Sequence, residues 1–312
     1  MNYPSLISLK MRKFLFQAYN FIAPWISKTG VTKIRLKEST LGQIFRLLFF
    51  RILHLHIPDP VETDGMVIYH SCPDKRGWLG WLYAFDNEPQ MRGMFKRVIK
   101  PGMTVVDIGA HIGYYTLLSA RLVGNTGKVY AFEPDPSYYG LLKKNIEVNK
   151  LASIVWPFNF AVGNNNGKIP FFLGISTGSS LFRVPDITGQ KVLVDIVSLD
   201  NFSARRNWPV VDFVKIDAEG ADKIVLDGMR SVLERNPAIK LVIEVNPSSL
   251  KSADTSAEAL FLLLVELGFN RVCALFGAME LYEIPKDIEY LLKISAERGY
   301  LNLFCERNHA FC

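Results

Sequence analysis

The residues that decide the fold are Val105-Val106-Asp107-Ile108-Gly109-Ala110-His111-Ile112-Gly113. Their apolar beginning predicts a buried strand, and the glycines predict a turn into a helix over residues 113–123. In an open α/β sheet, ligands bind beyond the carboxyl ends of the strands, where a helix N-terminus favours a carboxylate or phosphate. His111 stands where the pattern G-x-G-x-x-G has its middle glycine, which disfavours a dinucleotide and favours a smaller ligand.

An acidic residue follows the next predicted strand. Residues 128–132 are apolar, and Glu133 comes directly after them. A carboxylate at this place can accept hydrogen bonds from both hydroxyls of a ribose. The turn and Glu133 together therefore predict a nucleoside pocket. Asp135 has two interpretations, a ligand contact or a helix N-cap, because Pro136 follows it.

Two further predicted strands, residues 211–216 and 238–245, end in charged residues. The first brings Lys215, Asp217 and Glu219 to its carboxyl end, and alternation places them on one side while the strand lasts. The second brings Glu244, with Asn246 after it. Such carboxylates suit a general base, a metal ion or a cationic ligand. The alternative is that Lys215 pairs internally with Asp217 or Glu244.

Strands and helices alternate through most of the chain, which predicts an α/β fold with a doubly wound, mostly parallel sheet covered on both faces. A third strand is predicted over residues 153–162, further helices over 90–99, 137–150, 221–234 and 255–267, and a β-rich end at 271–276, 280–284 and 301–306. Residues 163–210 interrupt this order. Strands 168–173 and 191–197 predict an inserted hairpin there, with Gly178-Ser179-Ser180 between them.

Basic charge is concentrated in the first 57 residues. They hold nine basic residues and one acidic residue, so their formal net charge is +8. Residues 58–312 carry −2, and the whole chain therefore carries +6. The apolar runs 14–27 and 41–57 are interrupted by polar residues, so we expect no spanning helix, which needs about 20 apolar residues, and no secretory signal. We expect an amphipathic helical segment on an anionic membrane surface. A contact with the body or another subunit is the alternative, and nucleic acid is not an expected partner.

This reasoning divides the chain into residues 1–57, a connector or lid over 58–100, and a domain over 101–312. In the connector, Trp78 and Trp81 predict an acceptor-pocket wall or a hydrophobic plug. The composition, 49% hydrophobic and 21% charged, excludes an intrinsically disordered chain. Four cysteines without a CxxC pair favour reduced thiols in the cytoplasm, with neither a disulfide framework nor a zinc site.

The motifs, taken in order, resemble the FkbM family of S-adenosylmethionine-dependent methyltransferases, which have a class I Rossmann-like fold. The blocks that carry the resemblance over roughly residues 85–250 are Pro101-Gly102, residues 107–116, Phe132-Glu133-Pro134-Asp135, Asn159-Phe160-Ala161-Val162-Gly163, Gly178-Ser179-Ser180-Leu181, Val197-Ser198-Leu199-Asp200 and Lys215-Ile216-Asp217-Ala218-Glu219-Gly220. Two positions depart from the family pattern, since His111 stands in place of Asn and Ala218 in place of Val. The resemblance implies a Rossmann-like, mostly parallel sheet of seven strands. The inserted β-hairpin and the N-terminal helical extension are predicted from the sequence patterns above, because the first 57 residues lie outside the resemblance.

The resemblance also implies roles for individual residues. The turn after the first strand would lie beside the methionine part of S-adenosylmethionine, Glu133 would hold the ribose hydroxyls, and Asp217 would face the methyl group and the acceptor. Asn159 and Phe160 would surround the adenine. The implied cofactor-binding residues are Asp107, Gly109, Ala110, His111, Gly113, Glu133, Pro134, Asn159, Phe160 and Asp217.

The implied reaction is O-methylation, in which the acceptor hydroxyl loses its proton near the transfer. Asp217 and Glu219, ahead of Glu244, are the candidates for the base or for acceptor orientation, and Lys215 is their electrostatic partner. His70 and His111 are weaker candidates. No compact motif predicts metal ligands, so metal dependence stays open.

These observations predict a methyltransferase that acts on a lipid-linked, glycan-like or other small-molecule hydroxyl at the cytoplasmic face of a membrane, as a monomer or a homo-oligomer. Two alternatives come from other classes. One is a non-catalytic membrane-associated or oligomeric protein that keeps the nucleoside pocket. The other is a nucleotide-dependent oxidoreductase, which His111 disfavours.

Overall fold

A computed structural model describes residues 59–70, 88–174, 179–182 and 190–307. The predictions for residues 1–57, for Trp78 and Trp81 in the connector and for Gly178 lie outside these residues. From Pro60 onward, the described residues belong to one compact unit. The boundaries predicted at residues 57 and 100 stay predictions.

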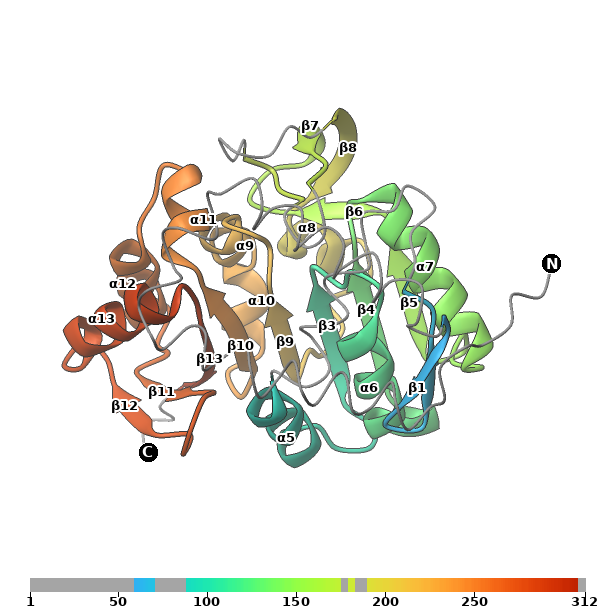
Figure 1. Cartoon of the computed structure of the whole chain (residues 1–312), viewed down its shortest axis with the longest axis horizontal. Coiled ribbons are helices and arrows are strands. Elements are labelled where there is room, and N and C mark those ends of the chain that lie inside the picture. Colours follow the sequence, from blue (N-terminus) through green and yellow to red (C-terminus); the bar gives the residue numbers. More distant parts are fainter. Residues whose placement is uncertain (1–58, 71–87, 175–178, 183–189, 308–312) are drawn as a thin grey trace, which may run out of the picture. The chain divides into compact units, whose positions relative to one another are not determined.

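The described part contains a sheet of eight strands in the order β12-β11-β13-β10-β9-β3-β4-β5 (Figure 1). The strands are β3 (Thr104–Ile108), β4 (Lys128–Phe132), β5 (Val155–Phe158), β9 (Phe213–Ile216), β10 (Lys240–Val245), β11 (Arg271–Ala274), β12 (Leu281–Glu283) and β13 (Leu301–Glu306). Neighbours from β10 to β5 are parallel. The pairs that involve β13, β11 and β12 are antiparallel. The predicted α/β sheet is confirmed, with eight strands in place of seven because β12 adds to the edge at β11.

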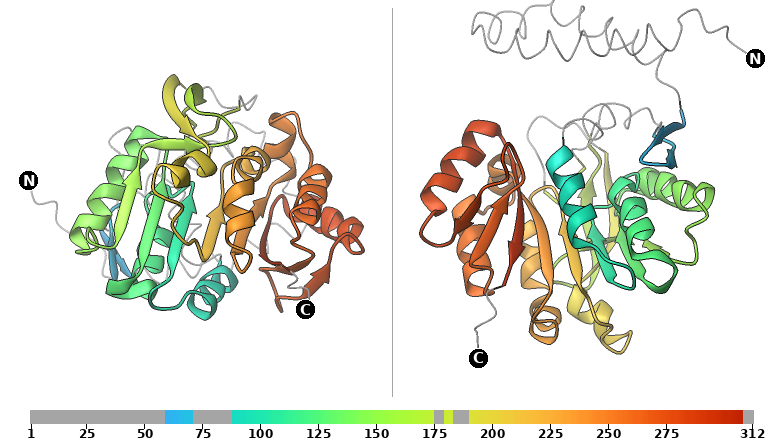
Figure 2. Two further views of the ribbon diagram at one scale, coloured as in Figure 1. Left: turned by 180° about the vertical axis from the view of Figure 1, so that it is seen from behind. Right: turned by 90° about the horizontal axis from the view of Figure 1, so that it is seen from below.

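Helices cover both faces of this sheet. The first layer consists of α5 (Pro89–Val98), α6 (Tyr114–Val123) and α7 (Pro136–Val148). The second consists of α8 (Leu199–Ala204), α9 (Asp222–Asp227), α10 (Arg230–Arg235), α11 (Pro247–Ser252), α12 (Ala257–Glu266) and α13 (Ile288–Arg298). Viewed from below, α6 and α7 lie on one side of the sheet and α8 and α10 on the other (Figure 2).

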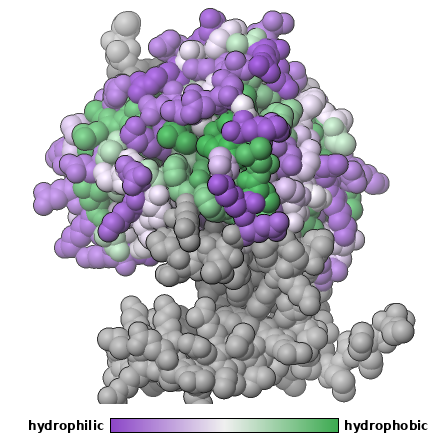
Figure 3. Space-filling view, turned by 90° about the horizontal axis from the view of Figure 1, so that it is seen from above, coloured by the Kyte–Doolittle hydropathy of each residue, from purple (hydrophilic) through white to green (hydrophobic). Residues whose placement is uncertain are grey.

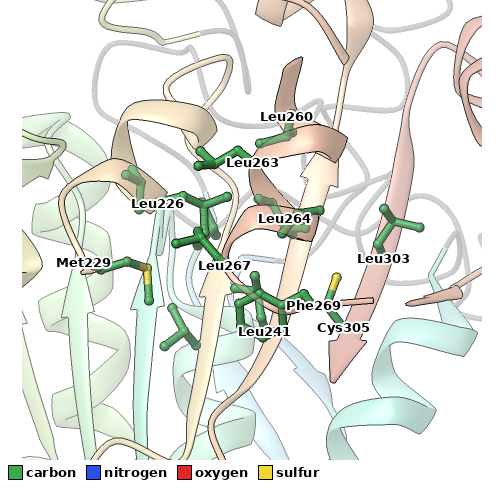
Figure 4. Close-up of a cluster of buried hydrophobic side chains, with 14 of the residues drawn as sticks. Leu226, Met229, Leu241, Leu260, Leu263, Leu264, Leu267, Phe269, Leu303 and Cys305 are labelled. Atoms are coloured by element: carbon green, nitrogen blue, oxygen red, sulfur yellow. The ribbon is translucent and has the colours of Figure 1, made fainter. Parts of the chain in front are cut away.

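Side-chain alternation along the strands supplies two separate cores. Val105 packs with the first helix layer, whereas its neighbour Val106 packs with the second. Figure 4 shows the second core, where leucines of α12 meet Leu241 of β10 and Leu303 of β13. This alternation is why the strands of a sheet buried on both faces are almost continuously apolar.

The helix predicted over residues 221–234 is instead two helices, α9 and α10. A Cβ atom at Gly228 would come 1.9 Å from the carbonyl oxygen of Gly163, so the chain bends where the two backbones touch. The carboxylate of Asp200 then accepts hydrogen bonds from the amides of Ser231 and Val232 at the start of α10. A distant cap of this kind leaves no local signal in the sequence.

The prediction of a single strand over residues 153–162 is also wrong. It is divided at Asn159 into β5, in the large sheet, and β6 (Phe160–Val162). With β7 (Gly167–Phe172) and β8 (Lys191–Val197), β6 forms a three-stranded sheet in the order β6-β8-β7. The antiparallel pairing of β7 with β8 confirms the predicted inserted hairpin.

A short hairpin of β1 (Val61–Thr63) and β2 (Met66–Ile68) docks against α7. Asn145 and Asn149 lie one helical turn apart. The side-chain amide of Asn145 accepts from the backbone N–H of Tyr69 and donates to its carbonyl. The side-chain amide of Asn149 does the same with Val67. The two asparagines thus satisfy the outer edge of β2 as a neighbouring strand would. None of the described helices is both long enough and apolar enough to cross a membrane.

Candidate active site

A cavity of 430 Å³ lies at the carboxyl ends of the parallel strands. Its lining comes from the turns that follow β3, β4, β9 and β10, together with β6, β7 and residues next to α5 and β13. Seen from above, this side of the molecule carries an area of hydrophobic residues next to hydrophilic ones (Figure 3). The structure therefore brings the ends of four separate strands into one site, as the motif order predicts.

The turn after β3 depends on three residues in the left-handed region of backbone space. Gly109, His111 and Gly113 have φ values of 75°, 53° and 95°. A Cβ atom at Gly109 would lie 1.8 Å from the carbonyl oxygen of Asp217. Glycine is therefore required at position 109 because the backbones at the ends of β3 and β9 touch there, in addition to any space that a ligand needs.

The imidazole of His111 lines the cavity and packs against Tyr138, with 4.0 Å between the ring centroids. Burial lowers the pKa of His111 to about 4, so the ring is neutral at physiological pH. Its Nε2 atom is buried and has no hydrogen-bond partner among the described residues. This nitrogen is available to a bound ligand.

The carboxylate of Glu133 also lines the cavity and is 5% exposed. Its two oxygens accept hydrogen bonds from the backbone amides of His111, at 2.7 Å, and Asp135, at 2.8 Å. Burial raises the pKa of Glu133 to about 8, although these amides oppose the shift. Each oxygen keeps a second lone pair, so a carboxylate held in this way can still accept a hydroxyl.

Asp135 serves as the N-cap of α7, because its Oδ1 atom accepts hydrogen bonds from the amides of Ser137 and Tyr138. Its other oxygen accepts a hydrogen bond from the hydroxyl of Ser179 at 3.0 Å. The N-cap interpretation of this residue is confirmed.

Lys215 reaches from β9 beneath the turn after β3. Its Nζ atom donates to the carbonyl of Gly109 at 3.1 Å and forms ion pairs with Asp107 at 3.2 Å and Asp217 at 3.4 Å. Burial by itself lowers the pKa of Lys215, but the two carboxylates raise it above its usual value. The alternative in which Lys215 pairs with Asp217 is confirmed, with Asp107 as a second partner that the sequence did not indicate.

Three of the predicted acidic residues, Asp217, Glu219 and Glu244, line the cavity together. Burial, with the neighbouring carboxylate of Asp217, raises the pKa of Glu219 and of Glu244 well above its usual value. Strand alternation does not explain the place of Glu219. Strand β9 ends at Ile216, and Glu219 has a φ of 49° in a turn fastened by Asp222, which accepts hydrogen bonds from the amides of Ala218 and Gly220.

Sequence reasoning missed a fourth acidic residue, Glu88. It lies at the start of α5, lines the cavity and accepts hydrogen bonds from the hydroxyl of Tyr115 at 2.8 Å and the amide of Asn302 at 2.7 Å. Burial raises the pKa of Glu88, although the Tyr115 hydroxyl opposes the shift. The signal available in the sequence was its place before Pro89, which marks a helix start. Tyr300, which also lines the cavity, was missed as well.

Some predicted site residues lie behind the cavity and do not line it. Asp107 is buried against Lys215 and the hydroxyl of Thr116, and Gly113 faces Leu142. Asn159 donates hydrogen bonds to the carbonyls of Glu133 and Pro134 and so holds the turn that carries Glu133. Of the other implied residues, those in the cavity lining are Gly109, Ala110, His111, Glu133, Pro134, Phe160, Lys215, Asp217, Glu219 and Glu244. His70 is buried and is not part of this lining.

The sequence matches the family described as the methyltransferase FkbM domain over residues 107–271, more than half of the chain. This chain belongs to the FkbM methyltransferase family. The match begins at Asp107, near the end of β3, and includes the turn that follows and the ends of β4, β9 and β10, which carry the cavity. The FkbM chain is therefore an S-adenosylmethionine-dependent methyltransferase, which decides against the binding-protein and oxidoreductase alternatives.

Curated relatives agree with this membership. The FkbM chain is 26% identical to 31-O-demethyl-FK506 methyltransferase FkbM of Streptomyces tacrolimicus, over 60% of this chain and 81% of that protein. It is 26% identical to the hexuronic acid methyltransferase AglP of Haloferax volcanii, over 41% of this chain and 50% of that protein. A protein-L-isoaspartate O-methyltransferase of Arabidopsis thaliana is 27% identical over 34% of this chain and 46% of its own length. The FkbM chain thus spans most of the first relative and about half of the other two.

The chain also aligns with solved structures, among them the following two. M. jannaschii TYW2 in complex with AdoMet has a TM-score of 0.40 and 17% identity, and the similarity covers 80% of this chain and 85% of that one. An rRNA methylase from Streptococcus thermophilus has a TM-score of 0.40 and 12% identity, covering 70% and 93% of the two chains.

The residues of the FkbM chain fit S-adenosylmethionine, which supplies a methyl group on a cationic sulfur when bound. The buried Nε2 of His111 offers a hydrogen bond, and Glu133 offers a carboxylate to hydroxyls. The acidic side chains of Glu88, Asp217, Glu219 and Glu244 line the same cavity, and a positively charged ligand would stabilise their ionised forms. Among the described residues, no three His, Cys, Asp or Glu side chains are grouped as metal ligands.

Proposed function

We propose that this methyltransferase transfers its methyl group to a hydroxyl oxygen and that Glu219 takes the hydroxyl proton. The observation that carries the proposal is that Glu219 lines the same cavity as Glu133 and Asp217, and burial with the neighbouring Asp217 carboxylate raises the pKa of Glu219. A general base works best when its pKa lies near the working pH, and an ordinary glutamate is too acidic for that. Glu133 would accept the ribose hydroxyls at the other side, which leaves the acidic turn after β9 for the acceptor.

Asp217 and Lys215 would position the acceptor in this scheme. Asp217 keeps 40% of its side chain exposed while its Oδ2 atom contacts Lys215. A carboxylate fixed in this way can hold a second hydroxyl of the acceptor, and fixed orientation is a large part of the rate gain in group transfer. Glu244, whose pKa is also raised, is the second candidate for the base.

Methyl transfer itself tests this proposal. Lipid and glycan extracts from cells that lack the active protein are incubated with the purified protein and labelled S-adenosylmethionine, and mass spectrometry identifies the product that gains one methyl group. With that acceptor, Glu219→Gln should lower kcat by about 100-fold or more, which is typical of losing a general base. It should also remove the rise of kcat with pH, and binding of S-adenosylhomocysteine should be retained.

The exposed Glu147 of α7 supplies a matched control, since Glu147→Gln makes the same chemical change away from the cavity. Glu244→Gln and Asp217→Asn separate the roles of the neighbouring carboxylates. If Glu219→Gln keeps the wild-type kcat and pH profile, Glu219 is not the base. If the methyl group is found on nitrogen, the proposed reaction class is wrong.

We also propose that the acceptor is a lipid-linked or glycan-like hydroxyl and that residues 1–57 hold the enzyme at the cytoplasmic face of a membrane. The support is the net charge of +8 on a segment rich in Phe and Leu. Each basic residue near an anionic surface contributes about 1 kcal/mol of binding free energy. The full chain should float with vesicles of phosphatidylcholine and phosphatidylglycerol, and a chain beginning at Pro58 should not. Equal flotation of both chains would contradict the membrane role.

A further inference from the structure

A second cavity, of 300 Å³, adjoins the first. It lies between the start of α5, the turn after β11 and the junction of α13 with β13. Glu88 and Tyr300 line both cavities and so form their common boundary. None of the residues that follow β3, β4, β9 or β10 lines this second space.

Arg298 supplies a positive charge to the second cavity. It is the last residue of α13, and Gly299 ends that helix with a φ of 88°. The guanidinium carbon lies 4.5 Å from the centroid of the Phe276 ring, a cation–π contact that orients the group. Among the described residues, no carboxylate forms an ion pair with Arg298. Its planar set of N–H donors is therefore available to a ligand.

The two cavities differ in the charge of their lining residues, and this difference favours one orientation of a bound ligand. Glu88 lines both cavities, but Asp217, Glu219 and Glu244 line only the first, and an anionic group there would be repelled by Asp217 and by either glutamate once it is ionised. Arg298 attracts the same group in the second cavity, where the amides of Gln90 and Asn302 add hydrogen-bonding capacity. A molecule with one acidic group and one free hydroxyl would therefore bind with its acidic end at Arg298.

We propose that the second cavity binds an anionic group of the methyl acceptor, a carboxylate or a phosphate carried by a hydroxylated ring, and that Arg298 is its bidentate partner. This inference rests on the proposed function, because binding at Arg298 would direct a hydroxyl past Glu88 and Tyr300 toward Glu219. Arginine matches the geometry of both anions, since its donors form two parallel hydrogen bonds to two oxygens.

Binding of simple sugars to the full chain, saturated with S-adenosylhomocysteine, tests the proposal by ligand-observed NMR. The probes are methyl glucuronide, glucose 6-phosphate and the uncharged methyl glucoside. At least one anionic probe should bind about tenfold more tightly than methyl glucoside, because hydrogen bonds between two charged groups are stronger than those between neutral groups. The preference between the two anions identifies carboxylate or phosphate as the recognised group.

Arg298→Ala should abolish this preference, and Arg298→Lys should retain part of it because the charge remains. Lys293→Ala, which removes one positive charge from an exposed position of α13 outside both cavities, should leave it unchanged. Affinity for S-adenosylhomocysteine should be the same in all three variants. The proposal is overturned if neither anionic probe binds more tightly than methyl glucoside, or if Arg298→Ala keeps the preference. Failure of Glu219 as the base appears only in the methyl-transfer assay, so the two results are distinguishable.

Discussion

Lys215 and Asp107 form an ion pair whose side chains are only 3% and 2% exposed. The pair connects β9 to β3 directly beneath the turn that carries His111, so the ends of two central strands share one buried charge contact. Removing one partner of a buried ion pair leaves the other charge uncompensated, and this lowers the free energy of unfolding far more than losing a surface pair does. The stability of the sheet and the shape of the site therefore depend on the same two residues.

Lys215→Met should lower the free energy of unfolding by about 3–5 kcal/mol, since Asp107 then keeps its buried charge without the ammonium. The double variant Lys215→Met with Asp107→Asn should lose less than the sum of the two single variants. Urea denaturation measures both. Lys168→Ala is the control, because its pair with Asp195 has side chains 59% and 52% exposed and should contribute less than about 1 kcal/mol. Additive losses in the double variant would contradict the pairing.

Gly109→Ala should destabilise the protein by more than about 2 kcal/mol. An alanine must adopt a left-handed conformation there, and its Cβ atom would overlap the carbonyl oxygen of Asp217. Gly140→Ala in α7 is the matched control, because its Cβ atom would meet nothing within 4 Å. That variant should be about 0.5–1 kcal/mol more stable than the wild type. The melting temperatures of the two variants should shift in opposite directions, and a stable Gly109→Ala variant would refute the close contact.

Asn145→Ala should lower the free energy of unfolding by about 1–3 kcal/mol, because backbone groups of Tyr69 and Ile112 lose their partner. Hydrogen exchange at the Tyr69 amide should accelerate with it, since that amide donates to Asn145 Oδ1. Glu147→Ala, an exposed change on the same helix, should alter neither quantity. Unchanged exchange at Tyr69 would mean that β2 is held in place by other contacts.

Glu133 should make stability depend on pH in a defined direction. Its pKa rises from 4.5 to about 8 on folding, so the folded state holds the proton more strongly than the unfolded state does. The resulting stabilisation is complete below pH 4.5 and is lost as pH rises through 8. The stability of the wild type relative to Glu133→Gln should therefore fall as pH increases across this window. Chemical denaturation at a series of pH values measures the difference, and a constant or rising difference would contradict the assignment.

The sequence by itself determined the main alternation of strands and helices, the turn after β3 and the acidic residues at the ends of β4, β9 and β10. These features follow from short-range rules, namely apolar periodicity, glycine at tight turns and the convergence of parallel strand ends at one edge. The chain order of the motifs was enough to indicate the family because each motif is contiguous.

Only the tertiary structure decided which residues share the cavity and which support it. Glu88 and Tyr300 come from segments far apart in the sequence, yet they form one boundary between two cavities. Asp107 and Asn159 belong to the motifs but lie behind the cavity, because Lys215 and the carbonyls of Glu133 and Pro134 take up their polar groups. The split of residues 153–162 into β5 and β6 likewise follows from pairing with different sheets. Such outcomes depend on distances between residues that are remote in the chain, and the three-dimensional packing of the sheet sets those distances.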